Sequence, residues 1–321
     1  MLQHSRQNRN DCVTPSSFAA KPVAPDVLIH MHIPKTAGTS LNSLVQHGFR
    51  NDEVVDTTVI GAELRNGLGL ATYESCRQLL ASYAPDDLRR VRYVSGHLPM
   101  GLHRAFDRSS KYFTVIRHPI DRAISSFFFL MQQNKPYLKD GRVLTLEEYA
   151  AIRCDVRLCN YQVRIVSGCS ELVGERIGQG MHTPGTPVER RHLEEAKRNI
   201  EEYFLSVAPL ENMTELALLL RRVYGWPMRR LLTEYKNRTR QRPRVHEVSR
   251  QVIKIIEECN LYDWELYEWV RKRFAAQLQR FEPELSKDRL ALEAISRALN
   301  VAGKVLPWSA RKRLAQVLFY A

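Results

Sequence analysis

The stretch that decides the fold of this 321-residue chain reads Val27-Leu28-Ile29-His30-Met31-His32-Ile33-Pro34-Lys35-Thr36-Ala37-Gly38-Thr39-Ser40. Its first six residues are mostly apolar, as in a buried strand, and a short loop and the start of a helix follow them. The unpaired N–H groups and the positive dipole end of a helix start attract anions. The stretch therefore predicts a site for the phosphate groups of a nucleotide-type ligand.

The residue order in this loop differs from that of a Walker A loop, which ends in Gly-Lys followed by Ser or Thr. Here Lys35 precedes Gly38, and Thr39 and Ser40 open the helix. We also find no strand of four apolar residues followed by Asp, the Walker B pattern. A P-loop kinase would need both features and is kept as the alternative enzyme class, and we expect no metal ion.

A second strand and a helix are predicted further along the chain. Residues 111–116 are an apolar run that ends at Arg117, and Pro119 suits the first position of a following helix. Ser125 would lie about two turns into that helix, roughly 9 Å along its axis. A guanidinium and a hydroxyl in this arrangement can converge on one phosphate group.

A third strand end brings a histidine to the same region. Residues 91–95 alternate as a strand does, Gly96 permits a tight turn, and His97 follows. Because ligands of open α/β sheets bind at the carboxyl ends of the strands, we expect Lys35, His97 and Arg117 to share one crevice. His118 is also expected in the crevice, but the following Pro119 favours a structural role at the corner before the helix. His30 and His32 are interpreted as structural, with contact of His32 to a bound ligand as the alternative.

These motifs resemble those of sulfotransferases. The sequence from His32 to Ser40 is that of the carbohydrate family typified by heparan sulfate 2-O-sulfotransferase, and the resemblance covers residues 27–280, being strongest at 30–40, 94–98 and 117–127. It implies the donor 3′-phosphoadenosine 5′-phosphosulfate (PAPS), whose 5′ end would be held by Pro34, Lys35, Thr36, Ala37, Gly38, Thr39 and Ser40. It also assigns the 3′-phosphate to Arg117 and Ser125, and the role of catalytic base to His97.

The resemblance implies an in-line displacement. His97 would take the proton of an acceptor hydroxyl while Lys35 stabilises the charge that builds on the bridging oxygen of the donor. A side-chain pKa near neutrality would suit that base. We therefore predict a sulfotransferase that acts on a hydroxyl of a carbohydrate or glycolipid.

The charge of the chain limits its partners. With 48 Lys and Arg against 35 Asp and Glu, the net charge of +13 favours anionic ligands, which include PAPS, nucleic acid and membrane surfaces. A basic module that binds nucleic acid or a membrane surface without catalysis is the alternative outside the enzymes. Nucleic acid is not the partner we expect.

The six cysteines form no CxxC pair and have no histidine at zinc spacing, so we interpret them as free thiols. They are Cys12, Cys76, Cys154, Cys159, Cys169 and Cys259. A Cys154–Cys159 disulfide in an oxidising compartment is the alternative.

The predicted architecture is a P-loop-like, three-layer α/β fold with a central parallel sheet, flanking helices and a helix-rich C-terminal half. We expect a flexible polar tail at 1–26, a sulfotransferase domain at 27–282 and a basic amphipathic helical extension at 283–321. Because no apolar run is long enough to span a membrane, we expect a cytoplasmic enzyme. The extension would cover the domain's own core, a partner or the inner face of a membrane.

The pattern of the C-terminal half predicts one helix from Leu146 to Tyr161, then a buried strand at 203–208 and a helix from Leu210 to Tyr224 that stops at Gly225. We expect the polar residues of 160–164 on a solvated face, and the alternative is that they line the crevice. Residues 174–192 would be a substrate lid or a connector. The basic run at 236–244 is either an ordinary solvated loop or a contact for an anionic acceptor or the edge of the donor, through Arg238, Arg240 and Arg242.

Overall fold

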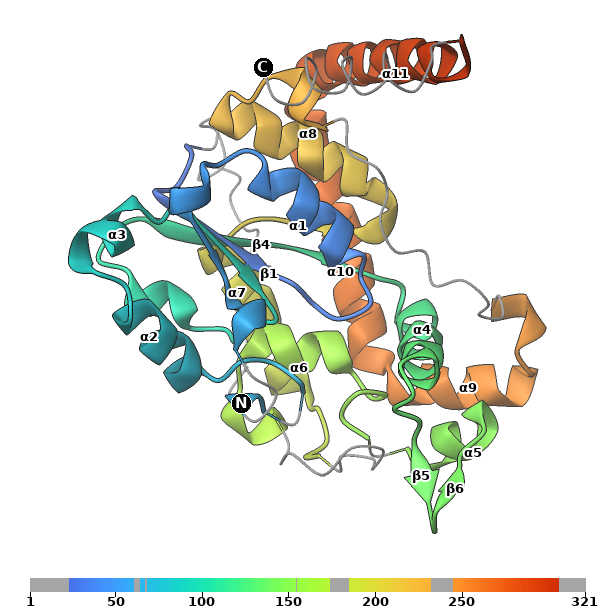
Figure 1. Cartoon of the computed structure of the whole chain (residues 1–321). Helices are drawn as coiled ribbons and strands as arrows, with labels where there is room; N and C mark the ends of the chain where they lie inside the picture. Colours follow the sequence, from blue (N-terminus) through green and yellow to red (C-terminus); the bar gives the residue numbers. More distant parts are fainter. Residues whose placement is uncertain are drawn as a thin grey trace, which may run out of the picture.

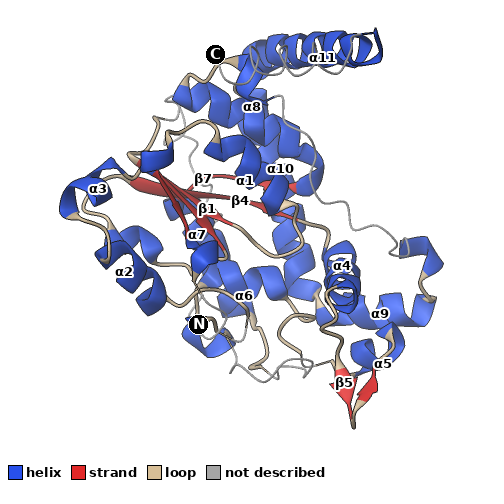
Figure 2. Cartoon of the chain, in the orientation of Figure 1, coloured by secondary structure: helices blue, strands red, loops and turns tan. Residues whose placement is uncertain are grey.

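Five parallel strands form the central sheet of the computed structural model, in the order β2-β3-β1-β4-β7 (Figure 2). Their bounds are β1 (Val27–Met31), β2 (Val54–Asp56), β3 (Tyr93–Gly96), β4 (Ser110–Ile116) and β7 (Phe204–Pro209). The structure describes residues 23–60, 64–66, 68–153, 155–173, 185–231 and 245–305. The predicted α/β class with a parallel sheet is confirmed.

The register of the sheet brings three strand ends to one edge. Met31 of β1 is paired with Gly96 of β3, and β4, on the other side of β1, continues past this level to Ile116. All three strands run in the same direction, so the segments that follow them emerge at the same edge. This geometry supports the expectation that the loop after β1, His97 and Arg117 line one crevice.

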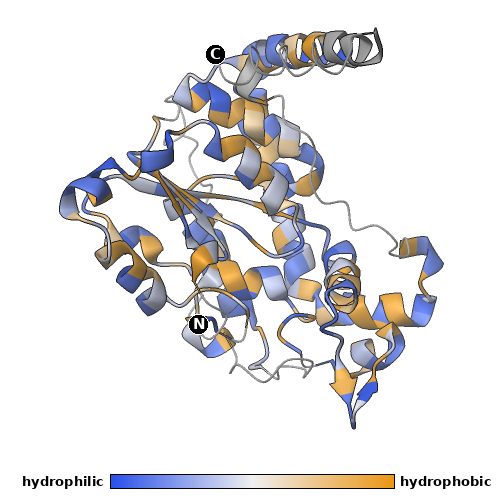
Figure 3. Ribbon diagram, in the orientation of Figure 1, coloured by the Kyte–Doolittle hydropathy of each residue, from blue (hydrophilic) through white to orange (hydrophobic). Residues whose placement is uncertain are grey.

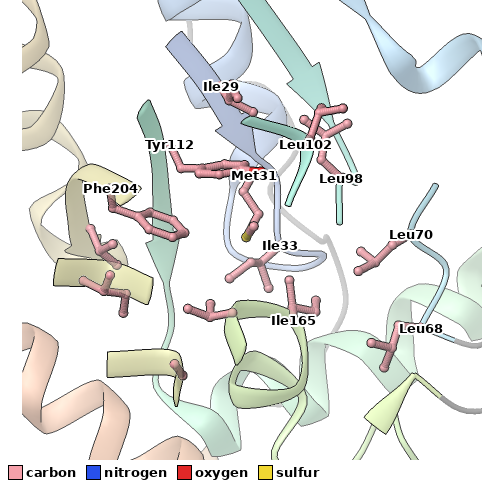
Figure 4. Close-up of a cluster of buried hydrophobic side chains, with 14 of the residues drawn as sticks. Ile29, Met31, Ile33, Leu68, Leu70, Leu98, Leu102, Tyr112, Ile165 and Phe204 are labelled. Carbon is pink, nitrogen blue, oxygen red and sulfur yellow. The ribbon is translucent and has the colours of Figure 1, made fainter. Parts of the chain in front are cut away.

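Alternate side chains of the strands point into two apolar layers. Ile29 and Met31 of β1 lie in the layer on one face, together with side chains of α2, α6 and α7, and Figure 4 shows part of it. Leu28 lies in the layer on the other face with side chains of α1 and α8. In Figure 3 the strands are accordingly the most uniformly hydrophobic ribbons, while the helices that cover them are two-sided.

The helices surround this sheet, with α1 and α8 on one face and α2, α6 and α7 on the other (Figure 1). Their bounds are α1 (Gly38–Gln46), α2 (Tyr73–Ala81), α3 (Pro85–Arg90), α4 (Pro119–Gln132), α5 (Leu146–Ala151), α6 (Tyr161–Ser167), α7 (Arg190–Tyr203), α8 (Met213–Tyr224), α9 (Arg250–Cys259), α10 (Leu261–Gln279) and α11 (Glu282–Val305). A small hairpin of β5 (Leu138–Lys139) and β6 (Arg142–Val143) lies apart from the main sheet.

The prediction of one helix from Leu146 to Tyr161 is wrong, because two helices occupy this region. The first, α5, begins in a capping box made by Thr145 and Glu148 and ends at Ala151. Arg153 and Asn160 then take left-handed backbone conformations, with φ of 60° and 47°, which no continuous helix can contain. By contrast, the predicted stop at Gly225 is confirmed: this residue ends α8 with φ of 68°.

The start of the predicted C-terminal extension packs on the domain. Leu285 of α11 is fully buried against α8, and the largely buried Asp288 pairs with Arg221 and Arg222 of α8 at 3.1 and 2.6 Å. Residues 306–321, including the basic cluster Arg311–Arg313, lie outside the described residues, as does the tail up to residue 22. Among the described helices, none has the length and apolarity needed to cross a membrane.

Candidate active site

The loop between β1 and α1 is curled by left-handed residues. Lys35 and Ala37 have φ of 73° and 61°, which is uncommon for residues other than glycine. The Thr36 side chain holds the curve from within by donating to the carbonyl oxygen of Ile33 at 2.8 Å. No described side chain caps α1, which begins at Gly38. The Ser40 N–H donates to the Ala37 carbonyl oxygen at 3.1 Å, so the amides of Gly38 and Thr39 are those of the first turn that could bind an anion.

Gly38 is needed because the ring of His32 lies against it. A Cβ atom at position 38 would overlap three atoms of that ring. His32 is held in turn between two other imidazoles, stacked on His30 with ring centroids 5.7 Å apart and edge-on to His97 at 4.7 Å. His32 therefore joins the loop to the end of β3.

His97 directly follows β3 and is half-buried. The turn before it is tight: Gly96 has φ of 143°, and a Cβ atom there would overlap the hydroxyl of Thr57. Burial lowers the pKa of His97 to about 4, with a further lowering by Arg65 and an opposing effect of Asp56. The imidazole is thus neutral at pH 7 and able to accept a proton, but its pKa is well below the near-neutral value expected from the sequence.

Arg117 connects the two predicted halves of the donor site. Its Nη1 donates to the carbonyl oxygen of Lys35 at 3.1 Å, and its Nη2 lies 3.5 Å from a carboxylate oxygen of Asp121. The Lys35 ammonium lies over the ring of Phe129, a residue of α4, at 3.7 Å from the ring centroid. Because residues four apart share a helix face, Lys35 reaches the side of α4 that carries the buried Ser125. The structure therefore brings Lys35 and Arg117 together, and Ser125 is buried on the neighbouring helix α4.

The backbone of Arg117 is held by a polar residue of the 160–164 stretch. The amide side chain of Gln162 accepts from the Arg117 N–H at 2.7 Å and donates to its carbonyl oxygen at 2.8 Å. Gln162 is fully buried and Arg164 is 3 % exposed. The expectation of a solvated face at 160–164 is therefore wrong, because these polar groups find partners inside the protein.

We call this internal network the clamp; it consists of Asn160, Gln162, Asn260 and Asp263. The N-termini of α6 and α10 cap each other in it: Asn160 Oδ1 accepts from the N–H of Asp263, and the Asp263 carboxylate accepts from the N–H of Gln162, each at 3.0 Å. In addition, Asn260 Oδ1 accepts from the Asn160 N–H at 3.0 Å. Asn and Asp ahead of helices are the signal that could have indicated these caps, but not their pairing.

The other predicted site residues have different surroundings. His118 stands just before α4 and packs edge-on against the rings of Trp264 and Tyr267, at 4.8 and 5.6 Å, in keeping with a structural role. The candidates Arg238, Arg240 and Arg242 lie outside the described residues, as does most of the predicted loop at 174–192.

One cluster of metal-ligand types occurs among the described residues, at Cys169, Glu171 and His192. His192 Nδ1 accepts from the backbone N–H of Glu189 at 2.9 Å, so the ring proton resides on Nε2, which faces Glu171 at 3.2 Å. The imidazole therefore caps α7 and pairs with a carboxylate, and its two nitrogens are both engaged without a metal ion.

The comparison with known families decides the class of the protein. Residues 23–157 match the model of the sulfotransferase family, and this segment contains the loop, His97, Arg117 and Ser125. The chain carries a sulfotransferase domain. No curated protein matches the chain. The sulfotransferase is thus an enzyme that transfers sulfuryl groups. The loop, His97 and Arg117 follow the carboxyl ends of β1, β3 and β4.

Proposed function

We propose that this sulfotransferase moves the sulfuryl group of PAPS to a hydroxyl of a carbohydrate or glycolipid acceptor. The observation that supports it most is the hydrogen bond from Arg117 to the Lys35 carbonyl oxygen, because it fixes a second cationic group beside the anion-binding loop. A donor with phosphate groups on both the 3′ and the 5′ positions requires two such groups close together.

The residues of the crevice fit the two ends of this donor. The loop from Pro34 to Ser40, with its uncapped helix start, would hold the 5′ end, and Arg117 and Ser125 would hold the 3′-phosphate. Arg117 is ion-paired with Asp121, so binding of the phosphate has to compete with that carboxylate. Only 15 % of the Arg117 side chain is exposed, and burial away from water strengthens any charge pairing that it makes.

PAPS, when bound, supplies an activated sulfuryl group with a good leaving group. In the proposal His97, neutral at pH 7, accepts the proton of the acceptor hydroxyl, and the Lys35 ammonium stabilises negative charge on the departing oxygen. A metal ion is not part of the proposal, since a sulfuryl group carries less charge than a γ-phosphoryl group.

The proposal assigns the reaction to the cytoplasm, with the C-terminal helices as the part of the chain that would meet an anionic membrane surface. The alternatives make different predictions. A P-loop kinase would require a metal ion and prefer ATP, and a basic binding module would bind no nucleotide while being retained on DNA in a salt-dependent way. The acceptor can be sought by offering labelled PAPS to fractionated glycan and glycolipid extracts.

The donor is tested by thermal shift with 3′,5′-bisphosphoadenosine, the product that sulfuryl transfer would leave. We expect it to raise the melting temperature without magnesium and by more than ATP does, because Arg117 and Ser125 select a 3′-phosphate. Arg117→Ala should weaken binding of bisphosphoadenosine much more than binding of adenosine 5′-phosphosulfate. The exposed Arg89→Ala is the matched control and should change neither affinity.

Three outcomes would contradict the proposal. Equal stabilisation by ATP or a strict requirement for magnesium would favour the kinase. No stabilisation by any nucleotide would favour the binding module. Equal losses for both ligands in Arg117→Ala would remove this residue from the 3′-phosphate site while leaving the donor open.

A further inference from the structure

Two cysteines meet at the junction of α6 and α9. Cys159 stands two residues before α6, and Cys259 is the last residue of α9, about 100 positions further along the chain. Their thiols share one acceptor: Cys159 Sγ lies 3.0 Å and Cys259 Sγ lies 4.0 Å from the carbonyl oxygen of Arg153. They are also hydrogen-bonded to each other. Both are free thiols in this structure.

The backbone around the pair is fixed from several sides. Each cysteine is followed by an asparagine of the clamp, and the bond from the Asn160 N–H to Asn260 Oδ1 ties the two neighbours together. The Arg153 side chain adds an ion pair to Glu258 at 2.7 Å. The thiols therefore face each other because the surrounding fold holds them there, which raises their effective concentration for reaction with each other.

We propose that Cys159 and Cys259 are a redox-active dithiol that forms a reversible disulfide when the protein meets a peroxide. Nothing in the sulfotransferase reaction requires this pair, so the inference is independent of the proposed donor and acceptor.

The two thiols differ in a way that sets the order of reaction. Cys259 is partly exposed, and its pKa is lowered chiefly by the hydrogen bond that it accepts from Cys159, with a further lowering by Arg153. Cys159 is buried, and the same hydrogen bond together with burial raises its pKa. Cys259 is thus the thiol that an oxidant reaches first, and Cys159 is the one that resolves the product.

The reaction balances with peroxide as the oxidant. The Cys259 thiolate attacks one peroxide oxygen, the O–O bond breaks, and a sulfenic acid forms while hydroxide leaves. The hydroxide takes up the proton that the Cys259 thiol had released, which gives one water. Cys159 then attacks the sulfenic sulfur, the S–O bond breaks, and the disulfide and a second water form. A small thiol reductant such as glutathione returns the disulfide to two thiols by thiol–disulfide exchange.

The Cys159–Cys259 disulfide would close a loop of about 100 residues directly beside the clamp. Such a cross-link stabilises a protein mainly by restricting its unfolded chain. We therefore expect oxidation to raise the melting temperature by about 5 °C or more, and to slow amide hydrogen exchange at the N-termini of α6 and α10 several-fold.

The test treats the full chain with a small excess of hydrogen peroxide and maps disulfides by mass spectrometry of the unreduced digest. We expect a linked peptide pair that contains Cys159 and Cys259, has lost two hydrogen atoms and disappears on reduction. Cys259→Ser should abolish the pair and the rise in melting temperature. The matched control is Cys169→Ser, which replaces another partly exposed thiol that has no described cysteine beside it, and both effects should persist in it.

Several results would overturn the proposal. One is oxidation of Cys259 to sulfenic or sulfinic acid with no linked peptide. Another is a bridge between Cys159 and Cys154 in its place. A melting temperature that rises equally in wild type and Cys259→Ser would assign the stabilisation to a different reaction.

Discussion

His97 is neutral because the protein surrounds it, and this sets the limits of its chemistry. Its burial and the nearby Arg65 both disfavour the imidazolium, so the pKa falls to about 4. A base with this pKa is unprotonated at all physiological pH values. The same low pKa means that it binds the proton of the acceptor hydroxyl more weakly. The carboxylate of Asp56 acts in the opposite direction and is placed to stabilise the proton once His97 has accepted it.

Replacing His97 should separate chemistry from binding. We expect His97→Ala to reduce sulfuryl transfer by about 10²- to 10⁴-fold while leaving bisphosphoadenosine affinity nearly unchanged. Lys35→Ala should lower both, because its ammonium would touch the donor before and during the reaction. His103→Ala is the control, since that ring stacks on Tyr203, 4.3 Å away, and should leave transfer unchanged.

The wild-type rate should depend on pH in the direction set by the lowered pKa. Because only the neutral imidazole accepts a proton, the rate should stay level from pH 8 to about pH 5 and fall as the pH drops through 4. Transfer rates measured on a stable acceptor across this range check it. A fall centred near 6.5 would contradict the low pKa of the base. Near-normal transfer by His97→Ala would move the base to another residue, first His118 or His32.

Gly38 offers a test of the loop geometry. A methyl group there would overlap the ring of His32, so Gly38→Ala should displace either the loop or the ring and weaken bisphosphoadenosine binding at least tenfold. The double variant Gly38→Ala/His32→Ala makes room for the methyl group and should recover part of the loss. Affinities of both single variants and the double variant complete the cycle. Strictly additive losses would show that the two positions do not compete for space.

The reciprocal caps of α6 and α10 are the structural support of Arg117. Asp263 is fully buried, and its two oxygens accept from the N–H groups of Gln162 and Val163 at 3.0 and 2.8 Å. Burial raises the pKa of this carboxyl group, and those two backbone bonds oppose the effect. Its charge is thus stabilised by the positive end of α6.

Removing the Asp263 carboxylate should destabilise the whole domain. Asp263→Ala leaves two buried N–H groups without their acceptor, at a cost of about 3 kcal/mol. Urea unfolding at pH 7 measures this loss of unfolding free energy. Asp86→Ala is the exposed control, for which we expect no measurable change. The variant should also loosen Gln162 and, through it, the backbone of Arg117, so bisphosphoadenosine affinity should fall. A loss of less than about 1 kcal/mol would mean that water replaces the carboxylate.

The buried histidines of the whole fold make its stability depend on acid. Burial lowers the pKa of His30 to about 3 and of His97 to about 4, and it lowers that of His32 as well. In the unfolded chain a histidine titrates near 6.5. Between about pH 6.5 and 4 the unfolded chain therefore binds up to three more protons than the native protein.

Because the unfolded chain binds more protons, acid lowers the free energy of unfolding. Stability should be full above about pH 6.5 and fall as the pH drops, with a slope of up to about 4 kcal/mol per pH unit. The slope should decrease below about pH 4, as first His97 and then His30 become protonated in the native protein. Urea unfolding at several pH values checks it. His30→Leu should reduce the slope by about one third, because one titrating group is lost. His246→Asn, at the surface, is the control, and a slope that does not change in His30→Leu would refute the assignment.

The elements that the sequence predicts correctly are those whose signals are local. The apolar run at 27–31, the run that ends at Arg117 and the helix opened by Pro119 each depend on adjacent residues, and all three are present. The parallel direction of the strands follows from their connections through helices. The convergence of Lys35 and Arg117 could also be predicted, because carboxyl ends of parallel strands share an edge.

Tertiary packing decided what depends on partners far apart in the chain. Asn160 and Gln162 are polar and suggest a solvated helix, but residues about 100 positions later pair with them and bury them. The low pKa of His97 comes from its enclosure, which no local pattern encodes. Cys159 and Cys259 likewise meet only because the start of α6 and the end of α9 lie at the same place. The physical reason is the same in each case: burial and pairing are properties of the assembled fold, whereas strand, turn and helix starts are written in neighbouring residues.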